Sequence, residues 1–358
     1  NGSQGTQGTT GTQGTQGTDG TQGTAGNNFV HERTLWVDPN GNDGTAVLGR
    51  ADLPWQTIEA AVAYLSTNTL TNHTVIVMPG SYNEDTIQFN ASNNGTTIML
   101  NGGVRIYFTD ASYIDCRDEH AFSIIGPQKN VKNDIGIASN FSAGAIIQSA
   151  GDTNLVRLQP TAQDCYVGFT NVTLESTYTG SNGSAGSMFY MDGTGKGQTV
   201  RWDNCFILGN PDGIVPLFIV RTNPSVLSLE SQDCVWLNPR GAIDCTGLST
   251  GSQIFLNMNS NTFVTNGGTQ AGTYAHVNMQ IANGQSQGTF SNNKFYSNNT
   301  LSTANVYMIR NTNSSTFNLD AASSNVHNRD TITGINYLTP TITLLGNVKL
   351  NQPNYMQM

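Results

Sequence analysis

Charged side chains are scarce in this chain. Asp, Glu, Lys and Arg together make up 11% of the 358 residues, against about a quarter in an ordinary soluble domain. The formal net charge is −9, and no stretch of the sequence gathers Lys and Arg. Binding along a phosphate backbone depends on clustered cations, so the composition argues against a nucleic-acid partner. Asn, Thr, Ser, Gly and Gln are abundant instead, which is natural for repetitive extracellular or virion surfaces.

Long apolar runs and metal-ligand spacings are also lacking. No run of 18 or more apolar residues occurs, so the sequence predicts no membrane-spanning helix. The five histidines show no HxxxH spacing, and the five cysteines show no CxxC pair. We therefore predict neither a metal nor a cofactor. Cys205 and Cys234 hold matching places in consecutive repeats, which leaves a disulfide open, but a free Cys packing as a small buried hydrophobe is favoured.

The first 26 residues carry glycine at every third position, mostly in Gly-Thr-Gln triplets. This period is typical of a collagen-like triple helix, because only glycine fits at the axis of three chains. A flexible glycine-rich linker is the alternative, but a linker has no reason to keep the register. The segment contains no proline, so we expect a folded neighbour to hold three chains together. The glycines are Gly2, Gly5, Gly8, Gly11, Gly14, Gly17, Gly20, Gly23 and Gly26.

The second half of the chain repeats one short pattern. Each repeat has an alternating run, an Asn or Asp anchor, and then a bulky apolar residue. The anchors recur about every 30 residues, and such a period built from short strands predicts a stacked solenoid. We expect the anchors to be bend residues with positive φ, which Asn tolerates, and to form one ladder above stacked Phe206, Val235, Phe263 and Phe295. The anchors are Asn171, Asn204, Asp233, Asn261, Asn293 and Asn325.

The N-terminal part carries the most specific motifs. These are VDPNGNDGT at 37–45, PWQTIEAAVAYL at 54–65 and VIVMPGSYNE at 75–84. Ile58, Ala61, Val62 and Leu65 fall on one face at helical spacing. In this order the motifs resemble the N-terminal part of right-handed parallel β-helix proteins, the pectate-lyase-like superfamily. The resemblance covers residues 35–84 and implies a short helix that caps the open end of the solenoid.

Together these patterns predict an all-β chain, a right-handed parallel β-helix with a short N-terminal capping helix, preceded by a collagen-like triple-helical segment. We expect three strands per coil. The predicted domains are a stalk at 1–27, a joint and cap at 28–72, the β-helix at 73–330 and a C-terminal cap at 331–358.

Catalytic motifs are much less readable than the architecture. Glycosidases need two carboxylates that face one groove, and no acidic pair stands at matching repeat positions. The Asp38–Asp43 loop is only loosely like a calcium loop, and an Asx/Gly turn is favoured. We therefore predict no catalytic residue and read the acidic candidates as solvated turn residues. They are Asp115, Glu119, Asp192, Asp203, Asp212, Glu230 and Asp244.

The Gly-Thr-Gln triplets resemble collagen-like proteins of giant viruses, and a trimeric β-helix resembles viral tailspikes. These resemblances imply a noncatalytic structural or adhesive fibre protein at a virion surface or outside the cell, a homotrimer that binds host glycans. A tailspike-like polysaccharide hydrolase or lyase with carboxylates shared between subunits is one alternative, and a pure trimerisation module is another. Tyr178, Tyr274 and Trp236 are the predicted exposed aromatic contacts.

Overall fold

The computed structural model describes most of the solenoid and little of the N-terminal segment. The described residues are 1–6, 31–109, 111–117, 120–127, 144–149, 153–159, 165–177, 187–191, 197–209, 217–220, 226–237, 242–248, 253–265, 273–281, 286–297, 305–311, 317–322, 325–328, 344–346 and 348–350. Only Gly2 and Gly5 of the predicted stalk glycines fall within them. The collagen-like segment therefore stays a prediction.

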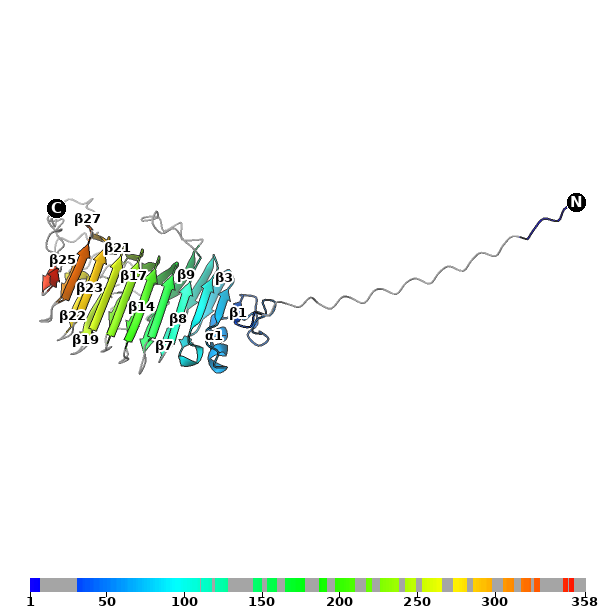
Figure 1. Cartoon of the computed structure of the whole chain (residues 1–358), viewed down its shortest axis with the longest axis horizontal. Coiled ribbons are helices and arrows are strands. Elements are labelled where there is room, and N and C mark those ends of the chain that lie inside the picture. The colour runs from blue at the N-terminus through cyan, green and yellow to red at the C-terminus, as the bar shows by residue number, and fades with distance from the viewer. Residues whose placement is uncertain are drawn as a thin grey trace.

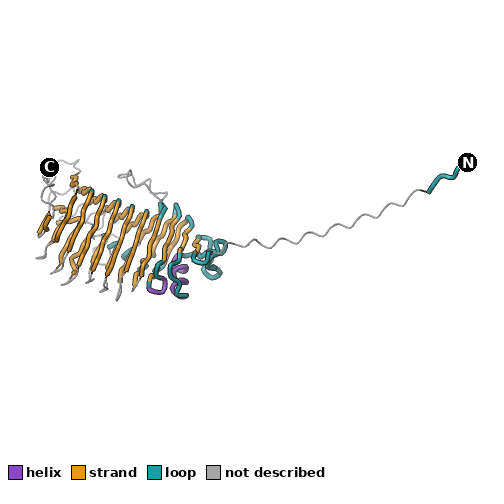
Figure 2. The backbone as a smooth tube through the Cα atoms, in the orientation of Figure 1, coloured by secondary structure: helices purple, strands orange, loops and turns teal. Residues whose placement is uncertain are grey.

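The described chain winds into a right-handed parallel β-helix, as the sequence predicted. Its strands form three parallel sheets, which we call A, B and C, and successive strands in each sheet come from successive coils. Each coil thus contributes one strand to each sheet, so the predicted three strands per coil are confirmed. Figure 1 shows the strands advancing in chain order from β1 toward β27, and Figure 2 shows them side by side along the molecule.

Sheet A contains β1 (Thr34–Val37), β2 (Thr74–Val77), β5 (Thr96–Leu100), β8 (His120–Ile125), β11 (Cys165–Thr170), β14 (Gly197–Asp203), β17 (Val226–Gln232), β20 (Gln253–Asn259), β23 (Ser286–Ser291), β26 (Phe317–Ala322) and β29 (Val348–Leu350). Sheet B contains β3 (Gly80–Glu84), β6 (Val104–Phe108), β9 (Ala145–Ser149), β12 (Val172–Ser176), β15 (Phe206–Leu208), β18 (Val235–Leu237), β21 (Thr262–Thr265), β24 (Lys294–Ser297) and β27 (Asn325–Asn328). Sheet C contains β4 (Ile87–Phe89), β7 (Ile114–Arg117), β10 (Val156–Gln159), β13 (Phe189–Met191), β16 (Phe218–Val220), β19 (Ile243–Leu248), β22 (Thr273–Ile281), β25 (Asn305–Asn311) and β28 (Leu344–Gly346).

A continuous apolar core fills the space between the sheets. Alternate residues of each strand point inward, so every coil adds its own apolar side chains to the same core. Aromatic rings touch in series along it, from Phe89 and Phe122, with centroids 4.0 Å apart, to Trp202 and Trp236, 5.0 Å apart. Because each coil packs only on its neighbours, the core lengthens without needing a second domain.

Helix α1 (Ile58–Thr67) lies beside the first coils, where the sequence predicted the capping helix (Figure 1). The four residues predicted to share a face are its buried ones. Thr57 is the N-cap and accepts a hydrogen bond from Ala60 N. A short 3-10 turn, η1 (Ala91–Asn93), follows β4.

The two ends of the solenoid extend beyond the predicted β-helix boundaries. Strand β1, in the predicted joint, pairs with β2 and begins sheet A. Strands β28 and β29, in the predicted C-terminal cap, pair with β25 and β26. Parallel pairing therefore runs from residue 34 to residue 350.

Candidate functional site

The predicted anchor row marks the bend between sheets A and B. Asn171, Asn204 and Asp233 have φ values of 57°, 53° and 53°, in the left-handed region that Asn and Asp tolerate better than most residues. Asn204 Nδ2 donates to Asn171 Oδ1 over 2.6 Å, so these two form a rung of the expected side-chain ladder. In the next two coils Ser260 and Asn292, not the predicted anchors, have the positive φ.

The predicted single ladder is therefore wrong, because the register divides its anchors between neighbouring rows. Asn261 and Asn293 lie one position after the bend, in the row of Cys205 and Cys234. Asn325 lies one position further again, because it pairs with Lys294. If a coil has one residue more or fewer before its Asn anchor, that anchor falls in the next row. The spacing between anchors in the sequence does not show which row each anchor occupies.

The row after the bend is a buried hydrogen-bonded ladder. Its members are Cys205, Cys234, Asn261 and Asn293, all at most 1% exposed. Cys234 Sγ accepts from Cys205 N over 3.3 Å, Asn261 Oδ1 accepts from Cys234 N over 3.0 Å, and Asn293 Oδ1 accepts from Asn261 N over 2.9 Å. The last three of these side chains thus each satisfy a backbone N–H of the preceding coil, which would otherwise be buried without a partner.

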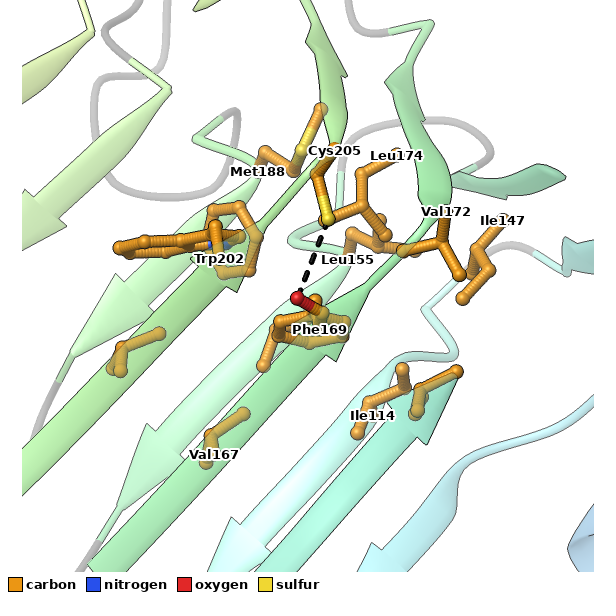
Figure 3. Close-up of a cluster of buried hydrophobic side chains, with 14 of the residues drawn as sticks. Ile114, Ile147, Leu155, Val167, Phe169, Val172, Leu174, Met188, Trp202 and Cys205 are labelled. Carbon is orange, nitrogen blue, oxygen red and sulfur yellow. Dashed lines mark hydrogen bonds between the residues drawn. The ribbon is translucent and has the colours of Figure 1, made fainter. Parts of the chain in front are cut away.

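Cys205 and Cys234, both within the described residues, are thiols and do not form a disulfide. Figure 3 shows Cys205 Sγ directed at the carbonyl oxygen of Phe169, 3.4 Å away, among core side chains. Burial raises the pKa of the Cys205 thiol, which disfavours the nucleophilic thiolate. These cysteines are structural.

The predicted inward stack of Phe206, Val235, Phe263 and Phe295 also needs correction. Phe206 pairs with Val235, but Val235 pairs with Thr262 rather than with Phe263. Phe263 instead pairs with Trp236, which pairs with Ile207 in the inward row. Phe206 and Val235 form a separate small cluster outside the main core.

Glu84, the last residue of the VIVMPGSYNE motif, caps helix α1. Its Oε1 accepts from Ile58 N over 2.9 Å and its Oε2 from Glu59 N over 2.8 Å. These are donors that a helix start leaves unsatisfied. Burial raises the pKa of Glu84 to about 7, although the two N–H bonds favour the charged form. The motif is therefore a structural device at the solenoid end.

The most distinctive polar cluster lies on the outward face of sheet C. Asp115 of β7 and Arg157 of β10 pair in register, as do Arg157 and Tyr190 of β13. Arg157 Cζ lies 5.3 Å from the ring centroid of Tyr113 and 5.6 Å from that of Tyr190, within cation–π range. Asp115 Oδ2 accepts from Arg117 Nε over 2.6 Å. We call Tyr113, Asp115, Arg117, Arg157 and Tyr190 the arginine cluster.

Within the arginine cluster, the charged groups of Asp115 and Arg157 differ in the partners that the protein gives them. Asp115 is 1% exposed and its carboxylate is paired with Arg117. Arg157 is half-buried, and among the described residues its one hydrogen-bond partner is the hydroxyl of Tyr113, 3.2 Å from Nη1. A guanidinium has five N–H donors. Its Nε is buried and has no partner among the described residues, so the N–H groups at the Nη end of the side chain are the ones offered to a ligand between the two tyrosines.

The other predicted acidic candidates do not gather into one buried site. Glu119, Asp192 and Asp212 lie outside the described residues. Asp244 shares the outward row of Asp115 but lies four strands away, roughly 19 Å at the usual strand spacing. That distance exceeds the separation that either class of glycosidase uses.

Asp203 and Glu230 lie closer together on the outward face of sheet A. They stand on adjacent strands, offset by two residues, so their Cα atoms are roughly 8 Å apart by strand spacing and rise. Asp203 Oδ2 lies 3.7 Å from Arg201 Nη2, and Glu230 Oε1 accepts from Ser228 Oγ over 3.5 Å.

The aromatic contacts predicted from sequence are replaced by others. Trp236 is 1% exposed, and its indole N–H donates to Ser231 Oγ over 3.0 Å. The prediction that it is exposed is wrong, because its place in the register turns it inward. Tyr178 lies outside the described residues, and Tyr274 lies on β22 with its side chain undescribed. Tyr113 and Tyr190, which the sequence reading missed, border Arg157 instead.

In the loop after β1, side-chain oxygens accept hydrogen bonds from the chain itself. Asp38 Oδ1 accepts from Asn40 N and Asn42 Oδ1 from Gly44 N, which are Asx turns. Asp43 accepts from Gln56 N, Thr57 N and the Thr57 hydroxyl. Across the described residues, no three of His, Cys, Asp and Glu are grouped as metal ligands. None of the helices in the described residues could span a bilayer.

The register would have been needed to find the arginine cluster from sequence. Arg157 and Asp115 stand on different strands, β10 and β7, and about 40 residues separate them in the sequence. Only the alignment of β7 with β10 shows that they are neighbours.

Comparison with known proteins gives weak similarities. No protein-family model matches the chain, and no curated protein matches it. It is similar to the tailspike protein gp49 of Acinetobacter baumannii bacteriophage Fri1, a capsular polysaccharide depolymerase, at 10% identity and a TM-score of 0.26, covering 92% of this chain and 65% of the tailspike. It is also similar to the A-module of the mannuronan C-5 epimerase AlgE6 of Azotobacter vinelandii, at 12% identity and a TM-score of 0.22, covering 88% of this chain and 98% of that module.

The chain therefore spans 65% of the length of the tailspike that it matches. Both TM-scores are too low to carry a functional argument. The assignment of the chain to the parallel β-helix fold rests on its own sheet topology.

Proposed function

We propose that the chain is a structural and adhesive fibre protein, a homotrimer at a virion surface or outside the cell that binds host glycans. The observation that carries the proposal is the arginine cluster on the outward face of sheet C. It combines a guanidinium held over two tyrosine rings with N–H donors that the described protein leaves unused.

The chemistry of this cluster suits a sugar ligand. Tyrosine rings offer apolar faces to the C–H bonds of a sugar ring, and their hydroxyls offer hydrogen bonds at the edges. Arg157 supplies directed donors to hydroxyl or carboxylate oxygens. Because the cluster spans three neighbouring strands, its residues are fixed by sheet pairing rather than by a loop.

The noncatalytic part of the proposal rests on what the buried polar groups do. Glu84 caps a helix, Asp115 pairs with Arg117, and the Cys–Asn ladder satisfies backbone groups. Each of these groups has a structural partner that accounts for it.

The test is a binding screen of the full chain against a panel of acidic and neutral polysaccharides, with each ligand also assayed for new reducing ends or unsaturated products. We expect at least one glycan to bind without being cleaved. Arg157→Ala should lower its affinity at least tenfold, and Arg157→Lys should lower it less. The matched control is Arg201→Ala, which removes a more exposed Arg from sheet A.

Equal loss of binding in the Arg201→Ala control would contradict recognition by the arginine cluster. An unchanged affinity of Arg157→Ala would contradict it too. Circular dichroism and melting of each variant separate loss of contact from loss of fold.

The second candidate function is polysaccharide cleavage by the Asp203–Glu230 pair. The two residues share the outward face of adjacent strands, and a glycosidase needs two carboxylates that face one groove. Cleavage products that disappear in both Asp203→Asn and Glu230→Gln would favour this function over adhesion. A protein that assembles but binds no glycan of the panel would favour the pure trimerisation module.

A further inference from the structure

The outward face of sheet A changes from apolar to polar side chains along one of its rows. One outward row begins at the edge strand β1 with Trp36, Ile76, Met99 and Ile125, which pair in register across β1, β2, β5 and β8. We call these four residues the apolar strip. The same row continues through Thr170, Asp203, Gln232, Asn259 and Ser291. It is thus apolar in its first four strands and polar in the next five, and it ends at Ala322 on β26.

The apolar strip is an unusual surface for a solvent-facing sheet. Met99 is 46% exposed, and it is one of only four large apolar side chains that are exposed in the described part of the chain. Two of the others, Tyr166 and Phe255, also lie outward on sheet A. Contiguous apolar surface on a soluble chain marks a contact site more often than chance.

The row beside the strip is small and uncharged. It consists of Thr34, Thr74, Thr97 and Ser123, on the same four strands. Short side chains let another backbone approach closely, and the absence of charge removes the main desolvation cost of such an approach. This part of sheet A is therefore suited to packing against a protein surface.

The position of the strip identifies the occupant as other copies of this chain. The strip begins at β1, eight residues after Gly26, the last glycine of the three-residue period. That period predicts three parallel chains in contact up to residue 26. The coils nearest that axis are the first coils of the β-helix. A row whose large apolar side chains lie only in its first coils fits contact between copies at this end.

We propose that three copies of this chain pack through the apolar strip of sheet A at the base of the β-helix. The inference rests on the proposed trimeric fibre and assigns the face that makes its contact. Four strands span only about 14 Å, whereas a stable interface buries about 800 Å² per partner. The strip therefore acts together with the N-terminal stalk rather than alone.

The test compares two substitutions in the same outward row of the full chain, Met99→Asp and Gln232→Asp. Each adds one carboxylate, but only the first places it in the apolar strip. We expect Met99→Asp to raise the chain concentration needed for half-assembly at least tenfold by sedimentation equilibrium. Gln232→Asp should assemble like the unmodified chain. Because Met99 points outward, circular dichroism and the monomer fold should be unchanged.

A cysteine crosslinking variant tests the same contact without depending on a loss of assembly. Met99→Cys should form disulfide-linked chain pairs under mild oxidation, whereas Gln232→Cys should not. The native cysteines are at most 7% exposed, so they give little background.

Assembly of Met99→Asp at the same concentration as the unmodified chain would overturn the proposed face, as would equal crosslinking of both cysteine variants. An unmodified chain that stays single would overturn both the face and the trimer. Glycan binding at the arginine cluster is measured separately, so its failure would leave the assigned face standing.

Discussion

Single residues at the bend between sheets A and B decide how the coils stack. Asn261, one position after the bend, shows this: its amide accepts from Cys234 N and Ser231 Oγ and donates to Ser231 O and Asn293 Oδ1. The side chain is fully buried. Removing it leaves backbone groups of the neighbouring coil without partners in a place that water does not reach.

We predict that Asn261→Ala lowers the free energy of unfolding by about 3 kcal/mol, because at least two buried polar groups lose their partners. The matched control is Asn257→Ala, on β20 just before the same bend and with its side chain exposed, which should cost less than about 0.5 kcal/mol. Urea unfolding of both variants measures the difference. Equal losses would contradict the ladder as described.

The sequence predicted bend residues but not their division into rows. Asn171 and Asn204 stand at the bend as expected, while Asn261 and Asn293 lie one position later. Local spacing does not fix register, because the residues before each bend differ in number from coil to coil. The same limit misplaced Trp236, since a shift of one residue turns a strand side chain to the opposite face.

Among the elements, helix α1 was the most predictable. Its buried face follows from the spacing of four apolar residues, which a helix places on one side whatever its tertiary partner. The role of Glu84 was not predictable, because the two N–H groups that it binds lie 25 and 26 residues earlier in the chain. The arginine cluster was missed for the same reason: it exists only once strands from different coils are aligned.

The elevated pKa of Glu84 predicts a specific pH dependence of stability. Burial raises the pKa from 4.5 to about 7, so the folded protein holds this proton more tightly than the unfolded chain does. The resulting stabilisation is complete below about pH 4.5 and is lost as the pH rises to about 7. It amounts to about 3 kcal/mol over that window.

Glu84→Gln isolates this contribution, because an amide does not titrate. We expect the unfolding free energy of the unmodified chain, relative to the Gln variant, to fall between pH 4.5 and pH 7. Urea unfolding at several pH values measures both. Two parallel pH profiles would contradict the assigned pKa.

At the scale of the whole molecule, the solenoid and the glycine-rich segment both contribute to the assembly of three chains. The apolar strip is too small to hold three chains firmly, and the glycine segment lacks proline to pre-organise it. Each part therefore needs the other. Deleting residues 1–26 should leave the solenoid folded by circular dichroism but raise the concentration needed for assembly. Unchanged assembly after this deletion would contradict a role for the stalk.

The central claim of a three-chain fibre is tested most directly by the mass of the full chain in solution. Sedimentation equilibrium over a wide concentration range gives that mass without reference to shape. The account predicts a species of three times the 38.3 kDa of one chain. This species dissociates on dilution, or when the sample is heated until the glycine-rich segment melts. A mass of one chain at every concentration would contradict it.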